Sequence, residues 1–370
     1  RAVRQPFHGL TPTRHTPGWF PRAGQQHGPG HLLQMSMRNL GVVVPFGQDF
    51  ALLGQTQAAV ERRPLVDLPA GDVLIKVSYS AINYKDAMAA QGHPGVARTF
   101  PHVPGIDAVG TVAQSSSSAF RVGDEVVLTS YELGVERWGG WAEYIRVSSD
   151  WVVPLPQGMS MVDCMTLGTA GLTAGLSIRA LQQHGVVPSA GEVLVTGATG
   201  GVGSLAVVLL AANGYTVVAV SGKPERIEWL RQLGASRVIS REDAQDGSKR
   251  PLLSATWAGI VDPVGGPMLA SLLRTVNNEG CVAACGVAGG AELHTSVYPF
   301  ILRGVTLRGI DSAWCSMQRR REVWQLLASD WKLDVLDKLR QTVGLDELAA
   351  NAPQMLAGSH VGRTVVDVRR

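Results

Sequence analysis

Residues Val193–Gly203 read Val-Leu-Val-Thr-Gly-Ala-Thr-Gly-Gly-Val-Gly, and this stretch decides the fold. An apolar strand ends at the turn and an apolar helix begins from it, which is the context that a dinucleotide-binding turn requires. Gly200 lets the backbone approach a pyrophosphate, Gly203 lets the helix pack closely on the strand, and the amino end of the helix faces the phosphates. The predicted site comprises Ala198, Thr199, Gly200, Gly201, Val202 and Gly203.

Strands and helices alternate after this turn. A helix over Val202–Asn213 leads to a strand over Thr216–Val220, and further strands are predicted at Arg237–Ile239, Ile260–Asp262 and Cys281–Cys285. Strand–helix alternation with short connections indicates a doubly wound parallel sheet, so the fold class is α/β with a Rossmann domain.

The rest of the chain predicts a second, mostly β domain. Short β runs separated by turn residues occupy residues 35–163, and the Rossmann domain is expected over 164–303. Residues 304–370 are expected to return to the first domain, beginning with a strand at Val305–Ile310. The 370 residues of the chain suit two domains.

The first 34 residues form a leader that contains Arg, His, Pro and Gly but no acidic residue. Two interpretations remain open: a mitochondrial or plastid targeting segment, or sequence upstream of a true start at Met35 or Met37. Both interpretations exclude the leader from the fold. The second one leaves the protein in the cytoplasm.

The composition is that of a globular protein, with 45% hydrophobic and 17% charged residues. A net charge of +3 is too mild to indicate nucleic acid, and no apolar run reaches the length of a membrane span. Four scattered cysteines do not make a disulfide framework, so reduced thiols are expected. A small-molecule partner is therefore expected, with neither nucleic acid nor membrane.

The strand after the dinucleotide turn ends in Val220-Ser221-Gly222-Lys223. Enzymes that use NAD usually hold Asp or Glu here, to bind the ribose 2′-hydroxyl. This chain has a hydroxyl at Ser221, an unhindered amide at Gly222 and a cation at Lys223, which suit a 2′-phosphate. Arg237 on the next strand could add a second charge. The sequence thus predicts NADPH as the cofactor.

A mostly β domain before a Rossmann domain is the plan of the medium-chain dehydrogenases/reductases. Zinc alcohol dehydrogenases of that superfamily need a Cys after an early strand, a later His–Glu pair and a four-Cys lobe. Here the corresponding segments are Ala81–Asp86, which lacks Cys, and Pro104–Asp107, where Ile106 stands in the His position. No metal site is predicted. The remaining chemistry is hydride addition to an electron-poor alkene or quinone, whose carbonyl needs only hydrogen-bond donors and a proton.

Several ordered motifs carry a closer resemblance, which runs from about Met37 to the C-terminus. They are Asn83-Tyr84-Lys85-Asp86, Pro104-Gly105-Ile106-Asp107, Trp138-Gly139-Gly140-Trp141-Ala142-Glu143, Gly168-Thr169-Ala170-Gly171, Val220-Ser221-Gly222-Lys223, Cys281-Val282-Ala283-Ala284-Cys285-Gly286 and Gly309-Ile310-Asp311-Ser312. The chain closely resembles the acrylyl-CoA reductase group of zinc-free, quinone-oxidoreductase-like medium-chain reductases. It departs from that group at Lys223, where Arg is common, and in its leader.

The resemblance implies a GroES-like catalytic domain beside the Rossmann domain, and reduction of acryloyl-CoA to propanoyl-CoA with NADPH. It also implies a homodimer that pairs through the strand at Val305–Ile310. The implied cofactor contacts are Tyr84, Ala198–Val202, Ser221–Lys223, Arg237, Val287, Ile301 and Ser312, with Val287 and Ile301 bordering the nicotinamide half.

Tyr84 is the first candidate for a polar contact at the reacting centre, as a donor or as a positioner of the nicotinamide; the alternative is a packed tyrosine. Asp86, the second candidate catalytic residue, could orient Tyr84 or form an ion pair with Lys85. Asp107 is expected to hold its loop, and Arg319–Arg321 to form a solvated helix face rather than to bind CoA phosphates. A quinone or enone reductase is the alternative enzyme, and a crystallin-like or RNA-binding role the alternative class.

Overall fold

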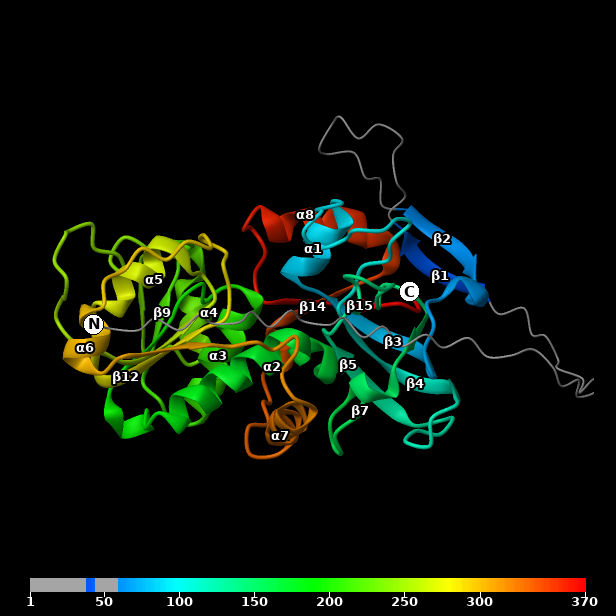
Figure 1. The fold of residues 1–370 in the computed structure, drawn as a ribbon, viewed down its shortest axis with the longest axis horizontal. Coiled ribbons are helices and arrows are strands. Elements are labelled where there is room, and N and C mark those ends of the chain that lie inside the picture. The colour runs from blue at the N-terminus through cyan, green and yellow to red at the C-terminus, as the bar shows by residue number, and fades with distance from the viewer. Residues whose placement is uncertain (1–37, 44–58) are drawn as a thin grey trace, which may run out of the picture. The chain divides into compact units, whose positions relative to one another are not determined.

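Two sheets dominate the part of the chain that this computed structural model describes, residues 38–43 and 59–370 (Figure 1). A parallel sheet occupies the left of the view and a mixed sheet the right. A separate antiparallel pair joins β1 (Arg38–Val43) to β2 (Ala59–Pro64). The leader, residues 1–34, lies outside the described residues.

The parallel sheet has six strands in the order β10-β9-β8-β11-β12-β13. Its central strands are buried throughout, as in sheets covered by helices on both faces. The strand order reverses beside β8, and at such a point the carboxyl ends of the strands form a ligand crevice. The strands are β8 (Val193–Val195), β9 (Val217–Val220), β10 (Arg237–Ile239), β11 (Trp257–Asp262), β12 (Val276–Ala284) and β13 (Thr306–Gly309).

Short helices connect these strands, and the doubly wound α/β fold predicted from the sequence is confirmed. Pro224–Arg226 forms one turn of 3-10 helix before α4. The α-helices of this half are α3 (Gly201–Ala212), α4 (Ile227–Gln232), α5 (Gly266–Leu273) and α6 (Tyr298–Arg303).

The mixed sheet has seven strands, in the order β14-β15-β3-β4-β5-β7 with β6 paired to β3. All its pairs are antiparallel except β14 with β15. The strands are β3 (Val73–Ile82), β4 (Asp107–Ser115), β5 (Glu125–Thr129), β6 (Tyr144–Val147), β7 (Val153–Pro154), β14 (Arg340–Val343) and β15 (Arg363–Asp367). The helices of this half are α1 (Tyr84–Ala90), α7 (Met317–Ala328) and α8 (Leu348–Leu356).

The long helix α2 (Met161–Gln183) joins the two halves. It breaks at Gly168, whose φ of 49° and ψ of −150° lie outside the helical range, so the helix is kinked there. Its length and apolar composition would suffice to cross a membrane, but 78% of the tested window is buried inside the protein. One hydrophobic core therefore continues from the mixed sheet through α2 to the parallel sheet.

The strand β13 belongs to the parallel sheet, because it pairs with β12 from Cys281 with Thr306 to Ala284 with Gly309. The sequence had assigned residues 304–370 to the returning segment. The Rossmann sheet therefore extends to Gly309, six residues beyond the expected boundary at 303.

Candidate active site

The turn between β8 and α3 has the backbone of a phosphate-binding loop. Gly197 has a φ of +53°, a left-handed conformation that favours glycine. A Cβ on Gly203 would overlap the Gly197 carbonyl oxygen, so only glycine allows α3 to begin this close to the strand. Gly200 is the N-cap of α3, and the N–H groups of the first helical turn are the donors that an anion can bind.

A cationic cluster surrounds the tip of β9. The Lys223 amide donates to Ser221 Oγ at 3.0 Å, and its ammonium donates to the carbonyl of His360 at 2.7 Å. Arg241 covers Gly222 so closely that a Cβ there would lie 2.6 Å from its Nε. Burial lowers the pKa of Lys223; the charge of Glu225 opposes this shift, and the charges of Arg226 and Arg241 add to it.

Arg237, which was expected to join this cluster, does not lie there. It is the first residue of β10, at the amino end of the parallel sheet, opposite to the carboxyl edge where ligands bind. Its guanidinium donates to both carboxylate oxygens of Glu192, at 3.1 and 2.8 Å, and lies 5.3 Å from the ring centre of Trp257. Arg241 takes its place. The sequence holds a signal for Arg241, because this cation follows the end of β10, whereas Arg237 stands at its start.

Asp86 fixes the start of α1. It is fully buried and accepts hydrogen bonds from the amide and side chain of Asn83, at 2.7 and 3.1 Å. The amides of Gly105 and Ile106 also donate to it, at 3.0 and 2.7 Å. Burial and the neighbouring Asp107 raise the pKa of Asp86 to about 7. The four N–H donors around its oxygens tie Asp86 to Asn83, which precedes Tyr84, and to the loop at Gly105.

Asp107 and Arg363 form a buried ion pair below this helix start, with 3.7 Å between Arg363 Nη2 and Asp107 Oδ2. Asp107 also accepts from the amide and hydroxyl of Thr169, at 3.0 and 2.5 Å, and from Asn83 at 2.9 Å. A Cβ on Gly168, at the break in α2, would meet the carboxylate of Asp107, so glycine is required where these groups pack. The expectation that Asp107 holds its loop thus extends to a link with α2.

Arg363 connects this network to the phosphate-binding loop. Its guanidinium donates to the Asn83 side chain at 3.0 Å and to the carbonyl of Thr166 at 2.8 Å. A Cβ on Gly201, the first residue of α3, would lie 3.2 Å from its Nη1. The preceding amide, Gly362, donates to the carbonyl of Thr199 at 2.9 Å. One buried side chain therefore contacts the glycine turn, α2 and the start of α1.

The positions that hold zinc ligands in the zinc alcohol dehydrogenases carry other chemistry here. Asn83 lies in the segment where those enzymes hold Cys, and Ile106 stands in the His position. The Asp107 carboxylate is neutralised by Arg363 and saturated by N–H and O–H donors. Over residues 38–43 and 59–370, no three His, Cys, Asp or Glu side chains gather in a metal-binding cluster.

The side chains expected near the nicotinamide are only partly brought together. Tyr84, at the first turn of α1, is 46% exposed. Val287 follows β12, and Ser312 follows β13 and shares a 2.7 Å hydrogen bond with Thr173, so both lie at the carboxyl edge of the parallel sheet. Ile301 is 68% exposed on α6.

The helix α6 turns away from the carboxyl edge. Arg303, two residues after Ile301, donates to the carbonyl of Val276 at 3.1 Å, and Val276 begins β12 at its amino end. Ile301 lies two residues before Arg303 on this helix, and its contact with the nicotinamide half stays a prediction.

Arg320 corrects another expectation. The run Arg319–Arg321 was expected to be a solvated helix face, but Arg320 is fully buried. Its guanidinium donates to the carbonyls of Thr129 and Ser312, at 2.9 and 3.0 Å, and lies 4.3 Å from the ring centre of Tyr131. It joins the end of β5 to the segment after β13, and so positions Ser312.

Comparisons with known proteins agree with this architecture. The alcohol dehydrogenase GroES-like domain matches residues 69–157, and a domain family named zinc-binding dehydrogenase matches residues 201–329. YhfP of Bacillus subtilis, which carries a quinone oxidoreductase name, is 51% identical over 81% of this chain and 91% of its own. The acrylyl-CoA reductase AcuI of Ruegeria pomeroyi is 46% identical over 85% of this chain and 96% of its own.

The chain belongs to the zinc-free, quinone-oxidoreductase-like medium-chain dehydrogenases/reductases. The match to the domain family with a zinc name begins at residue 201, beyond both segments where the zinc ligands of other members stand. Within this reductase family, the Escherichia coli YhdH structure with bound NADPH has a TM-score of 0.84 and 45% identity, and covers 88% of this chain and 99% of its own. The YhfP structure with bound NAD has a TM-score of 0.86 and 47% identity, and covers 90% and 100%.

Proposed function

We propose that this chain uses NADPH to reduce the activated carbon–carbon double bond of an enoyl thioester, with acryloyl-CoA converted to propanoyl-CoA. The carrying observation is that Arg363 connects the phosphate-binding turn to Asn83, and Asn83 precedes the exposed Tyr84 in the segment where zinc enzymes hold a Cys ligand. The acrylyl-CoA reductase AcuI, at 46% identity over nearly its whole length, supports the thioester as substrate.

The residues at the crevice fit NADPH. The amides at the start of α3 suit the pyrophosphate, while Ser221, Lys223 and Arg241 suit the 2′-phosphate. NADPH, when bound, supplies the hydride. The YhfP structure contains NAD, so the coenzyme preference of this chain should be measured. The cations Lys223 and Arg241 predict a preference for NADPH.

The protein's part in the chemistry is to orient the thioester and to stabilise charge on its carbonyl oxygen. A metal-free site must do this with hydrogen-bond donors. Tyr84 is exposed, and the start of its helix is fixed by the two hydrogen bonds that Asn83 donates to Asp86. Tyr84 is therefore the catalytic residue that we propose.

The function is tested by following NADPH oxidation with acryloyl-CoA, crotonoyl-CoA and a benzoquinone. We expect the highest kcat/KM with acryloyl-CoA. The name of YhfP favours a quinone as the second candidate. A higher kcat/KM with the quinone than with either thioester would replace our proposal with that one.

Replacing Tyr84 by Phe is expected to lower kcat on acryloyl-CoA about 100-fold, the typical effect of removing one donor to a developing oxyanion. The KM for NADPH should change little, because the phosphate contacts are elsewhere. Tyr298→Phe, which removes another exposed tyrosine hydroxyl on α6, serves as the control. An unchanged kcat for Tyr84→Phe would show that this tyrosine is only a packing residue.

We also propose a homodimer that forms through β13 and α6. β13 has a partner on one side only, and α6 exposes Ile301 and Leu302, at 68% and 59%. An unpaired strand beside exposed apolar side chains favours pairing with a second copy. Light scattering after size-exclusion chromatography should give twice the chain mass. Replacing Leu302 by a charged residue should reduce the measured mass to that of the monomer. A monomer mass for the unmodified protein would contradict the proposal.

All four cysteines are free thiols, and Cys164, Cys281 and Cys315 are buried. Unpaired thiols suit a reducing compartment, and we propose the cytoplasm.

A further inference from the structure

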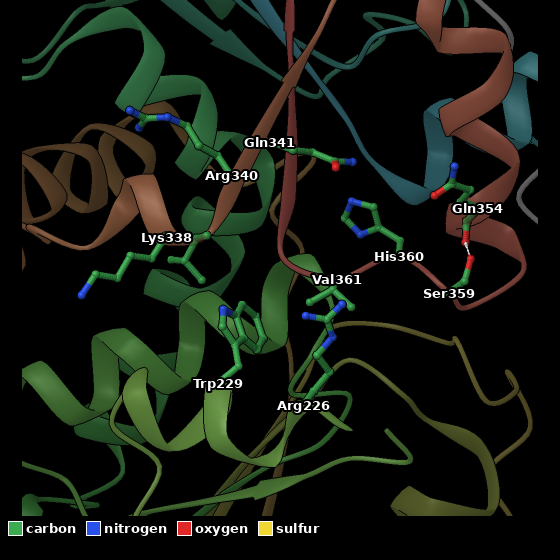
Figure 2. Close-up of a pocket in the computed structure, with 10 residues that line it drawn as sticks. Arg226, Trp229, Lys338, Arg340, Gln341, Gln354, Ser359, His360 and Val361 are labelled. Atoms are coloured by element: carbon green, nitrogen blue, oxygen red, sulfur yellow. Dashed lines mark hydrogen bonds between the residues drawn. The ribbon is translucent and has the colours of Figure 1, made fainter. Parts of the chain in front are cut away.

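A cavity of about 300 Å³ lies beside the cationic cluster and has no role in the proposed reaction. Figure 2 shows it between Arg226 and Trp229 on one side and Gln341, Gln354 and His360 on the other. The lining side chains include cations, amides and an aromatic ring, but no carboxylate. Such a lining selects against cations and favours an anion with a planar apolar part.

The cavity lies beside the residues that we expect to hold the coenzyme. The segment before β15 supplies Ser359, His360 and Val361 to the cavity wall. The same segment also contacts residues that we expect to bind the coenzyme. The His360 carbonyl accepts a hydrogen bond from Lys223 Nζ at 2.7 Å, and the Gly362 amide donates to the carbonyl of Thr199 at 2.9 Å. This segment therefore lies between the phosphate-binding turn and the cavity.

Arg226 provides the positive charge nearest to His360, because the ammonium of Lys338, which also lines the cavity, extends away from His360 in Figure 2. Its guanidinium points toward Val361 and His360 in Figure 2, and no acidic partner for it is found among the described residues. Arg340 is different, because it pairs with Asp163 at 2.5 Å and extends away from His360. An anion in the cavity would therefore be met by Arg226 first.

His360 adds an unpaired ring nitrogen. Only 9% of its surface is exposed, and Nε2 lies 2.9 Å from Thr364 Oγ1. In the tautomer in which the Thr364 hydroxyl donates to Nε2, the ring proton resides on Nδ1. Burial, together with the charges of Arg363 and Lys223, lowers the pKa of His360 to about 4, so the ring is neutral. Nδ1 is buried and has no hydrogen-bond partner among the described residues.

A buried unpaired N–H costs about 1–3 kcal/mol, and this cost is removed when a ligand brings an acceptor. Trp229, half-buried in the cavity wall, offers an aromatic ring to a planar base. The amides of Gln341 and Gln354 offer the donors and acceptors that the edge of a base needs. The volume suits a nucleoside phosphate rather than an entire coenzyme.

We propose that this cavity binds a phosphorylated adenosine group, with the base beside Trp229 and a phosphate between Arg226 and His360 Nδ1. Two sources share that chemistry: the nucleotide end of a CoA thioester and a free adenine nucleotide. The assignment to the CoA thioester rests on the proposed function. Its pantetheine arm would leave the cavity along the crevice toward the reacting centre.

The test titrates adenosine 3′,5′-bisphosphate calorimetrically into the full chain saturated with NADP⁺, so that the coenzyme crevice is filled. We expect one equivalent to bind, and Arg226→Gln to weaken binding at least tenfold. Trp229→Leu should weaken the bisphosphate in the same way but leave binding of inorganic phosphate unchanged. Arg231→Gln, an exposed arginine of α4 within 3.8 Å of Glu228, is the matched control and should change binding less than twofold.

Competition then separates the sources. Displacement of the probe by acryloyl-CoA assigns the cavity to the CoA substrate, whereas a probe unaffected by acryloyl-CoA assigns it to a free nucleotide; both support the site. Absence of binding, or a probe that binds only when NADP⁺ is removed, overturns it. The measurement needs no turnover, so a protein that binds the probe but does not reduce acryloyl-CoA would refute the proposed function alone.

Discussion

Replacing Arg363 by Met is expected to lower the free energy of unfolding by about 3–5 kcal/mol, the range for breaking a buried ion pair by removing one partner. The side chain is 1% exposed, and its loss leaves the carbonyl of Thr166 and the side-chain oxygen of Asn83 without their donor. The Asp107 carboxylate would remain buried without its counter-charge. Met fills a similar length, so the loss reports on polar contacts more than on a cavity.

Thermal unfolding measures this effect. A loss of that size should lower Tm by roughly 5–15 °C in a protein of this length. Arg231→Met, at an exposed position on α4, is the control and should leave Tm within about 2 °C. A similar Tm for the Arg363 and Arg231 variants would show that the network contributes little to stability. NADPH should partly restore the Tm of the Arg363 variant. Arg363 contacts the glycine turn, and a coenzyme bound at that turn stabilises the folded state.

The second large effect is expected from the double variant Lys223→Ala/Arg241→Ala. Each charged contact to the 2′-phosphate contributes about 1.5–3 kcal/mol, so the ratio of kcat/KM for NADPH over NADH should fall about 100-fold or more. The loss should appear in the KM for NADPH, while kcat/KM for NADH stays within a few fold. That difference distinguishes phosphate recognition from general damage to the crevice.

Arg237→Ala is the control for this prediction. It removes a positive charge of the same kind from the same sheet, but from the amino end, where Glu192 binds it. The coenzyme preference should stay within twofold. A loss of preference in Arg237→Ala with none in the double variant would reverse our assignment of the 2′-phosphate site.

Local sequence predicted the strands and helices well because their causes are local. The turn at Val193–Gly203 combines an apolar run with glycines at fixed spacing, and β8 and α3 form around it. The strand predicted at Arg237–Ile239 is observed over those residues. The break in α2 was not predicted, because Gly168 adopts its conformation to make room for Asp107 and Arg363, which come from distant strands.

The candidate site shows the same division. Lys223 was identified because the residue that follows the second strand has a fixed place at the sheet edge. Arg241, His360 and Arg363 were missed, since their roles depend on partners 19 to 280 residues away along the chain, such as Gly222, Lys223 and Asn83. Arg320 was misjudged for the same reason: a charged run on a helix is usually solvated, and only the packing of β5 against it shows that it is buried.

The sequence by itself determined the α/β class, the phosphate-binding turn, the lack of an acidic residue at the β9 tip and the loss of the zinc ligands. These are properties of residue type and spacing over short segments. The tertiary structure alone decided which arginines reach the coenzyme edge, that Asp86 is enclosed by N–H donors, and that a cavity opens beside Trp229. Such properties arise when segments remote in the chain are packed together, and the burial and charge balance of a side chain are set by that packing.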